Sequence, residues 1–202
     1  HNSEDYKVLF PAMIKSWRNM WQNKSLPFYF AQIAPYGYKD ANSAFLREAQ
    51  LTVMREVEHT GMASTLDIGD CDNIHPAQKK EVGERLALWA LSKDYDVYTG
   101  SYSGPVYKYM KGTENNRIQL YFDHVDGGLT SLGKKLTGFT IAGKDKIFHT
   151  ANATINSNGT IFVWAEGVEQ PVAVRYAFEN CPEASLFNEA GLPASSFRTD
   201  HF

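Results

Sequence analysis

The residues best placed to do chemistry in this chain are an aspartate and a histidine three positions apart. Asp72 and His75 lie in Asp72-Asn-Ile-His-Pro76, between an expected strand and an expected helix. An imidazole titrates near neutral pH, and a carboxylate that accepts its Nδ1 proton leaves Nε2 free to take a proton from a nucleophile. The spacing therefore makes the pair a candidate for the acid–base half of a hydrolytic triad. The alternative is an aspartate that caps the next helix and a histidine without a role.

The chain offers no clear nucleophile for such a pair. Gly100-Ser-Tyr-Ser-Gly104 resembles the G-x-S-x-G nucleophile elbow, but its central residue is Tyr102 and not a serine. Ser64 falls inside an expected strand, where a serine hydroxyl normally packs or is satisfied by the backbone. Cys71 directly precedes Asp72, and a role as thiol nucleophile would require all its orienting groups on one short loop. The absence of a nucleophile is therefore as informative as the Asp72–His75 motif.

Metal ligands are not indicated either. The histidines are scattered, and no two stand at the i, i+4 spacing of a helical zinc site. Asp67, Asp70 and Asp72 could suggest a cation, but Asp70 and Asp72 are more simply explained as residues that cap turns. Asp123 and His124 are adjacent on an expected strand and point to opposite faces, which indicates surface residues and not a dyad. No metal and no cofactor are therefore expected.

Composition limits the class of partner. The 202 residues carry a net charge of −3, with 43% apolar and 21% charged residues, and they contain no basic block. This balance is typical of a globular protein with a substantial core, and it argues against nucleic acid as the main partner. No apolar run approaches the ~20 residues of a membrane span. The chain starts at His1 without a methionine or an apolar leader, as a processed chain or a fragment would.

The two cysteines, Cys71 and Cys181, do not define a compartment. They could form a disulfide only if their Cα atoms lie within about 7 Å of each other, which the sequence does not show. Disulfides are uncommon in chains with so few cysteines. Two free thiols are therefore expected, with pairing as the alternative.

The first half of the chain alternates between helical and strand patterns. Helices are expected over 3–22, 43–59 and 76–92, and buried strands over 27–35 and 62–68. On the second helix, Phe45 is expected to face inward and Arg47 outward. Pro76 is expected in the first turn of the third helix, where proline costs no hydrogen bond. This order is typical of half of a doubly wound α/β sheet, whose sites lie at the carboxyl ends of its strands.

The second half has the alternating sequence pattern of an antiparallel β-structure. The helical period disappears after about Tyr98, and alternating segments appear at 118–122, 138–142, 147–155, 161–164 and 172–176. Asn158-Gly159 is the dipeptide that favours a tight hairpin turn. Two regions are therefore expected: residues 1–97 as an α/β part and residues 98–202 as a β-rich, sandwich-like part.

Short blocks distributed along nearly the whole chain resemble, in order, those of the sialate O-acetylesterase family. In the first half they are Trp17-Arg18 with Trp21, Leu26-Pro-Phe-Tyr-Phe30, Ala34-Pro-Tyr36, Leu46-Arg-Glu-Ala-Gln50, Gly61-Met62, Leu66-Asp-Ile-Gly-Asp70, Asn73-Ile-His-Pro76, Val82-Gly83 and Arg85-Leu-Ala-Leu88. In the second half they are Ser103-Gly-Pro-Val-Tyr107, Gly138-Phe139, Ile141-Ala-Gly143, Pro171-Val-Ala-Val-Arg-Tyr176, Gly191-Leu-Pro-Ala194 and Phe197-Arg-Thr-Asp200.

The resemblance implies a fold, a reaction and a base. The implied fold is the second half of a three-layer SGNH (flavodoxin-like) hydrolase sheet, followed by the β-rich region. The implied reaction is hydrolysis of O-acetyl esters of sialic acid through a serine acyl-enzyme, with His75 as base and Asp72 as its partner. The family's serine, in a Gly-Gln-Ser-Asn-like block, and its oxyanion asparagine, in a Gln-Gly-Glu-Ser-Asn-like block, lie upstream and are not present here. The chain therefore resembles the carboxyl-terminal portion of such an esterase, and its missing amino-terminal portion is an expected partner.

The substrate and the setting stay open at this level. Acetylated sialic acid follows from the resemblance, while acetylated xylan or another glycan would use the same chemistry. A non-catalytic, sugar-binding remnant is a further alternative, since exposed aromatic rings suit contacts with sugars. Export to the periplasm or outside the cell is expected for an enzyme that acts on such glycans.

Overall fold

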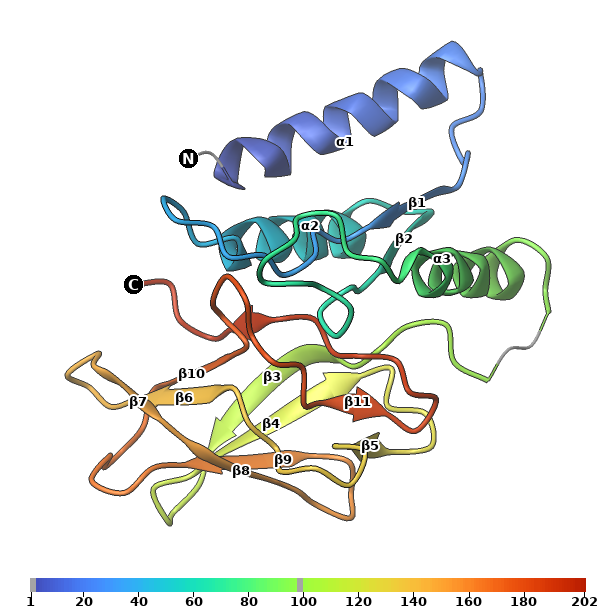
Figure 1. Cartoon of the computed structure of the whole chain (residues 1–202). Helices are drawn as coiled ribbons and strands as arrows, with labels where there is room; N and C mark the ends of the chain where they lie inside the picture. Colours follow the sequence, from blue (N-terminus) through green and yellow to red (C-terminus); the bar gives the residue numbers. More distant parts are fainter. Residues whose placement is uncertain (1–2, 98–99) are drawn as a thin grey trace.

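The computed structural model describes residues 3–97 and 100–202. His1, Asn2, Tyr98 and Thr99 lie outside the described residues, so the expected change of texture at Tyr98 and the boundary between 97 and 98 fall at a gap. Figure 1 shows the three helices in one part of the molecule and strands β3 to β12 in the other. The protein is therefore an α/β structure with several antiparallel sheets.

The three helices begin and end close to the expected positions. They are α1 (Ser3–Met20), α2 (Ala44–Glu56) and α3 (Lys79–Lys93). Pro11 lies inside α1. The prediction that the third helix opens on Pro76 is wrong: the helix starts three residues later, and Pro76 belongs to the preceding loop. The loop that carries Asp72 and His75 is therefore longer than expected.

A short parallel sheet lies between the helices. Strands β1 (Phe28–Ala31) and β2 (Thr60–Ala63) pair in register from Phe28 with Thr60 to Ala31 with Ala63. Alternate side chains of a strand point to opposite faces. Phe28 and Phe30 contact Phe10 of α1, whereas Tyr29 stacks on Trp89 of α3. Helices therefore cover both faces of this sheet.

The close packing of α3 depends on a glycine in β2. A Cβ added at Gly61 would lie 2.4 Å from the indole of Trp89. The Trp89 indole N–H donates a hydrogen bond to the Met62 carbonyl, 3.0 Å away. The absence of a side chain at Gly61 thus lets the helix approach the strand, and the indole of Trp89 is buried against it.

Two four-stranded antiparallel sheets make up most of the β-rich half. The first, in the order β3-β4-β9-β8, contains β3 (Val106–Gly112), β4 (Ile118–Asp123), β9 (Ile161–Trp164) and β8 (Asn152–Ile155). The second, in the order β12-β10-β6-β7, contains β12 (Phe197–Arg198), β10 (Ala173–Tyr176), β6 (Phe139–Ala142) and β7 (Phe148–Thr150). Short strands β5 (Leu129–Thr130) and β11 (Phe187–Asn188) form a further pair.

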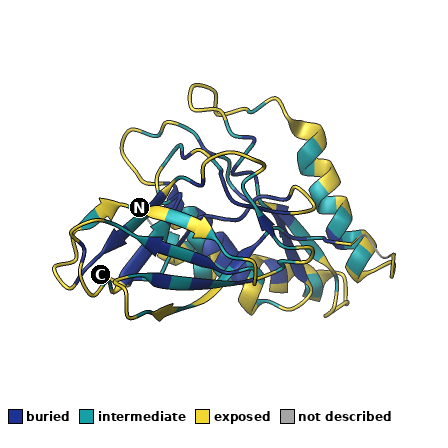
Figure 2. Cartoon of the chain, turned by 90° about the horizontal axis from the view of Figure 1, so that it is seen from below, coloured by how far each residue is buried: buried dark blue, intermediate teal, exposed yellow. Residues whose placement is uncertain are grey.

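One apolar core unites the two larger sheets. Leu120 and Ile161 from the first sheet and Ile141 and Val174 from the second belong to the same buried cluster. Figure 2 shows how burial concentrates in the strands while the connecting loops are exposed. Gly159, with φ of +74°, forms the expected turn between β8 and β9. Inward-facing alternation thus builds the β-rich half as predicted.

Three expectations for strands need correction. The expected strand 147–155 is two strands, because the chain leaves one sheet at β7 and enters the other at β8. Strand β3 has no counterpart in the expectations, since most of its side chains are exposed or half-buried and give little alternation. The strands expected over 27–35 and 62–68 are each four residues long, so Ile68 lies in a turn.

Within the described ranges, no helix combines the length and apolar character needed to cross a bilayer.

Candidate active site

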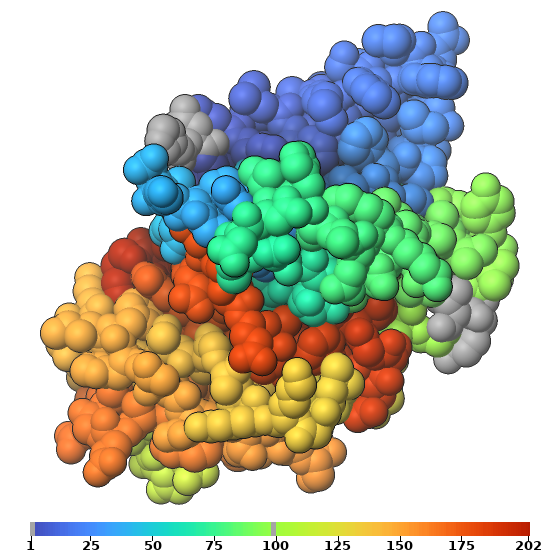
Figure 3. All heavy atoms as spheres, viewed as in Figure 1, coloured from blue at the N-terminus to red at the C-terminus, as the bar shows by residue number. Residues whose placement is uncertain are grey.

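The Asp72–His75 motif lies on the loop that joins β2 to α3. This loop starts at the carboxyl end of a parallel strand, beside the loop that follows β1. In open α/β sheets, ligands bind outside the carboxyl ends of the strands. In Figure 3 this segment, coloured green, lies at the surface of the molecule, next to the orange-red segment that follows β10. The motif thus lies at the edge of the sheet where ligand sites of such folds are commonly found.

Asp72 and His75 are both exposed, and each is fixed by a local turn. The Asp72 amide donates to the Asp70 carboxylate over 2.9 Å, and the His75 amide donates to the Asn73 side-chain oxygen over 2.9 Å. In the part of the chain that the structure describes, no hydrogen bond or ion pair joins the Asp72 carboxylate to the His75 imidazole. The structure thus brings the two residues to one loop, and their role as a catalytic pair stays a prediction. Asp70 caps a turn as expected.

Helix α3 holds the loop at its start, directly after β2. The Arg85 guanidinium forms two hydrogen bonds with the Asp67 carboxylate, of 2.7 and 2.6 Å, and a third of 2.7 Å with the Ser64 carbonyl. Both side chains of this ion pair are largely buried. Asp67 is therefore a partner of Arg85, and it fixes the start of the β2–α3 loop to the helix that follows the loop.

The prediction of two free thiols is wrong. Cys71 and Cys181 form a disulfide, with Cα atoms 5.6 Å apart. The two residues are separated by 110 positions, so only the tertiary fold brings them together. The bond ties the residue before Asp72 to the segment after β10, and it removes Cys71 as a candidate nucleophile.

The remaining serines do not supply a nucleophile beside a base. The Ser101 and Ser103 hydroxyls are buried and donate to the carbonyls of Ser103 and Gly104. Asn188 donates to Ser101 Oγ and to the Ser103 carbonyl. The buried Ser64 hydroxyl has no hydrogen-bond partner among the described residues, so no base contacts it. None of these three serine hydroxyls contacts a side chain that could act as its base among the described residues.

Arg47 is a residue whose importance the sequence pattern concealed. It was expected on the outer face of α2, yet it is fully buried, while Phe45 is partly exposed. Its guanidinium donates to Ser43 Oγ and Ser196 Oγ, both at 3.0 Å, and to the carbonyls of Ala177 and Glu179. Burial lowers the pKa of Arg47 to about 10, although the nearby Glu179 and Tyr38 oppose this shift. Arg47 lies on the side of α2 that also buries Ala44 and Leu51, so its place among these buried positions is the feature of the sequence that could have indicated a buried charge.

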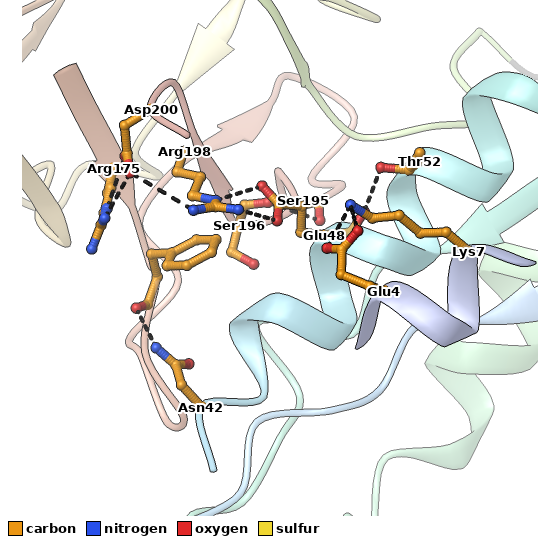
Figure 4. A network of polar contacts seen from close by, with 11 residues as sticks. Glu4, Lys7, Asn42, Glu48, Thr52, Arg175, Ser195, Ser196, Arg198 and Asp200 are labelled. Atoms are coloured by element: carbon orange, nitrogen blue, oxygen red, sulfur yellow. Dashed lines mark hydrogen bonds and ion pairs between the residues drawn. The ribbon is translucent and has the colours of Figure 1, made fainter. Parts of the chain in front are cut away.

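Polar contacts also join α2 to the carboxyl-terminal strands, as Figure 4 shows. Arg198 of β12 forms hydrogen bonds of 2.9 and 3.1 Å with the Glu48 carboxylate of α2. Asp200, whose side chain is fully buried, accepts bonds of 2.9 and 2.7 Å from Arg175 of β10. Helix α2 is thus fixed to the β-rich half.

A cavity of about 550 Å³ opens beside the amino terminus of α2. Its lining is mostly apolar and comes from α1, from the loop after β1 and from the start of α2: Ser3, Tyr6, Ile33, Tyr38, Asp40, Ala41, Asn42, Ser43, Phe45 and Leu46. Neither Asp72 nor His75 lines it. The cavity lies at the carboxyl end of β1 and contains no catalytic pair.

The described residues do not form a metal site. No group of three or more histidine, cysteine, aspartate or glutamate side chains that could hold a metal ion occurs in residues 3–97 and 100–202. Asp123 is exposed and pairs with Lys108, at 2.7 Å. His124 is half-buried beside the rings of Trp89 and Tyr102. Asp123 and His124 therefore face different surroundings: Asp123 lies at the surface as expected, whereas His124, also expected there, is half-buried.

Comparison with known proteins identifies relatives of the chain. No family model matches it. The sequence is 26% identical to the sialate O-acetylesterase of Mus musculus over 143 residues, which are 61% of this chain and 26% of the mouse protein. It is 25% identical to that of Rattus norvegicus over 137 residues, 58% of this chain and 25% of the rat protein.

The structural comparison covers more of the chain. A carbohydrate acetylesterase from Xanthomonas citri superposes with a TM-score of 0.90 and 38% sequence identity, over 98% of this chain and 46% of that one. The chain thus corresponds to about a quarter of its curated relatives and to less than half of this structural relative. The resemblance to sialate O-acetylesterases is confirmed, since the chain has homologues of that name and the fold of a carbohydrate acetylesterase.

Proposed function

We propose that this chain is the carboxyl-terminal portion of a carbohydrate O-acetylesterase, in which His75 acts as general base and Asp72 orients it. The observation that carries the proposal is the match to a carbohydrate acetylesterase over 98% of this chain and 46% of the relative. The nucleophilic serine and the oxyanion donors then come from an upstream portion, as the resemblance implies. The sheet of β1 and β2 would be the second half of a three-layer SGNH sheet.

The surface of α1 supports a contact with such a portion. Phe10 and Ile14 are buried against α2 and β1, but a second apolar stripe on α1 faces outward. Leu9, Met13 and Met20 follow helical spacing and are 66%, 38% and 74% exposed. A helix that is apolar on most sides is normally buried.

The parallel sheet supports the same contact. Within the described residues, β1 and β2 pair only with each other, which leaves the outer edge of each strand unpaired. Parallel sheets rarely consist of two strands alone. Further strands from an upstream portion would complete the sheet at β1 and cover the outer stripe of α1.

The proposed reaction depends on the position of the β2–α3 loop at the carboxyl edge of the sheet. An upstream serine at the carboxyl edge of the completed sheet would lie beside the β2–α3 loop. His75 would take the serine proton as the hydroxyl attacks the acetyl carbonyl, and would return it to the departing sugar oxygen. Water would then release acetate from the acyl-enzyme with the same base. The exposure of the His75 side chain leaves it free to reach a serine from another segment.

We further propose acetylated sialic acid as the substrate, from the names of the curated relatives. Acetylated xylan and other glycans share the same ester chemistry, so a panel of acetylated sugars has to accompany the sialate ester. We also propose an exported, periplasmic or secreted enzyme. The Cys71–Cys181 disulfide supports this setting, because such bonds persist mainly in oxidising compartments.

The test is reconstitution. The chain alone is expected to lack acetylesterase activity, and co-expression with the upstream portion of the same gene is expected to give turnover of an aryl acetate. In the assembled enzyme, His75→Ala should lower kcat by about 10²–10⁴-fold, the usual contribution of a general base. His149→Ala, at an exposed histidine on β7, is the matched control and should leave kcat unchanged. Full turnover by the His75→Ala enzyme would exclude His75 as the base.

A further inference from the structure

One short segment of the β-rich half contacts both loops at the carboxyl edge of the parallel sheet. Residues 177–181 follow β10, and they lie against the loop after β1 and against the loop that carries Asp72 and His75. We call residues 177–181 the tether segment. Its two central contacts come from adjacent residues, Asn180 and Cys181.

The Asn180 side chain uses both its donors and its acceptor on the loop after β1. Its Nδ2 donates to the carbonyls of Tyr38 and Ala41, at 2.8 and 2.6 Å, and its Oδ1 accepts the Ser43 amide proton at 2.6 Å. Its own carbonyl accepts the Tyr36 amide proton at 3.2 Å. Asn180 therefore fixes residues 36–43 and the start of α2.

Cys181 fixes the second loop at the residue before Asp72. The disulfide holds Cys71, and the Cys71 carbonyl accepts the Gly37 amide proton at 2.9 Å. A Cβ added at Gly37 would lie 2.8 Å from that carbonyl oxygen, so only glycine allows this approach. The two loops are thus joined directly by the hydrogen bond between Gly37 and Cys71. They are also joined indirectly, because both are bound to the tether segment.

The tether segment is itself held firmly by α2. Buried Arg47 donates to the carbonyls of Ala177 and Glu179. Asn42 donates to the Phe178 carbonyl at 3.2 Å, a contact drawn in Figure 4. The rings of Phe178 and Phe45 meet edge to face, with centroids 5.1 Å apart. The tether segment that contacts both loops is therefore itself fixed to α2 and to Asn42 just before it.

Residues 71–75, by contrast, have little support of their own. All five are exposed, and the hydrogen bonds of Asp72 and His75 noted above each reach only two residues back along the same loop. Among the described residues, the disulfide and the Gly37–Cys71 hydrogen bond are the polar or covalent contacts that join this stretch to a distant part of the chain. Without the disulfide, the position of His75 relative to the sheet would depend on that one hydrogen bond and on local turns.

We propose that the tether segment positions the base: the Cys71–Cys181 disulfide sets the location of His75, and Asn180 sets the facing loop against it. The inference rests on the proposed function for the identity of the base. Cys71, Cys181 and Asn180 are positioning residues, since they hold the loops and take no part in proton transfer.

The first test needs no activity and uses the chain by itself. The disulfide is cleaved with dithiothreitol, which supplies two electrons and two protons and becomes a cyclic disulfide. Amide exchange and ¹⁵N spectra are then compared before and after. The amides of Gly37, Asp72 and His75 should shift and exchange at least about tenfold faster, while those of β1 and β2 stay protected. Unchanged signals for all three amides would overturn the proposal.

The second test measures turnover by the assembled esterase. Cys181→Ser should lower kcat about 10–100-fold with KM nearly unchanged, because a displaced base impairs the chemical step more than binding. Asn180→Ala should act in the same direction. Asp200→Asn is the control for general destabilisation, since Asp200 contacts neither loop: it should lower the thermal midpoint and keep kcat. Equal kcat values for the wild type, Cys181→Ser and Asn180→Ala would overturn the proposal.

A third variant covers the case in which loss of the disulfide unfolds the chain. Gly37→Ala keeps the disulfide and pushes against the Cys71 carbonyl, so it should also lower kcat with little change in KM. A normal kcat for Gly37→Ala, with the ¹⁵N signal of His75 displaced, would show that loop position does not matter and would overturn the idea. An assembled wild-type enzyme without esterase activity would contradict the proposed function, and the exchange test would still decide whether the tether holds the loop.

Discussion

Single residues in this protein take their properties from partners that are distant in sequence, and His124 is an instructive case. Burial lowers the pKa of His124, and Lys93 and Arg55 act in the same direction, whereas Asp123 and Asp126 oppose the shift. The neutral imidazole is therefore the form that the folded state favours.

The sign of the pH dependence follows. The unfolded chain binds a proton at His124 near pH 6.5, but the folded protein does so only at a lower pH. The contribution of His124 to stability is thus fully present above about pH 6.5 and is lost as the pH falls from there to the folded-state pKa. His124→Asn, which suits the φ of +58° at this position, should reduce the loss of stability in that window. Urea unfolding from pH 4 to 8 measures it. A pH profile identical to that of the exposed-site control His149→Asn would contradict the assignment.

At the scale of elements, α1 is a helix that exposes apolar side chains to solvent. Its inner stripe packs on α2 and β1, while Leu9, Met13 and Met20 face outward, and Trp21 is 69% exposed. A purely amphipathic helix would show polar residues there. An exposed apolar stripe of this kind is what the proposed contact with an upstream portion requires.

The test concerns association with the upstream portion. Leu9→Glu should weaken binding at least about tenfold, because it removes apolar burial and introduces a charge at the contact. Titration followed by tryptophan emission, with Trp17 and Trp21 as probes, measures the dissociation constant. Lys15→Glu, at an exposed polar site on the same helix, is the control. A blue shift of the emission in the wild type is expected. Equal affinities for Leu9→Glu and wild type would show that this stripe does not form the contact.

At the scale of the whole molecule, a network of largely buried ion pairs joins α2 to the β-rich half. Arg198 bridges Glu48 of α2 and Asp200, and Asp200 in turn holds Arg175. The Asp200 side chain is fully enclosed. Loss of the Asp200 carboxylate leaves the Arg175 guanidinium without its charged partner, whereas Arg198 keeps Glu48.

Asp200→Asn should therefore lower the free energy of unfolding by about 3 kcal/mol. The matched control is Asp123→Asn, which breaks the exposed ion pair with Lys108 and should leave the unfolding midpoint within error. Denaturant unfolding at pH 7.5 compares the two variants directly. Similar midpoints for both variants would mean that burial does not set the strength of the Asp200 network.

Much of the local structure follows from the sequence alone. Helical spacing placed the three helices to within a few residues, and alternation placed most strands of the β-rich half. Asn158-Gly159 forms its hairpin because the turn needs a positive φ that glycine adopts freely. The Asp72–His75 loop was also placed correctly after a buried strand. These features depend on residues that are neighbours in the chain, so a local pattern is enough to predict them.

Other features were decided only by the tertiary structure. Cys71 and Cys181 meet across 110 positions, Arg47 is buried because distant carbonyls and hydroxyls satisfy it, and the stretch 147–155 divides between two sheets. Each depends on contacts between segments far apart in the chain, and the energy of such contacts leaves no periodic trace in the sequence. The sequence therefore determined which loop carries the candidate base, whereas the packing of the β-rich half against the helices decided what holds that loop in place.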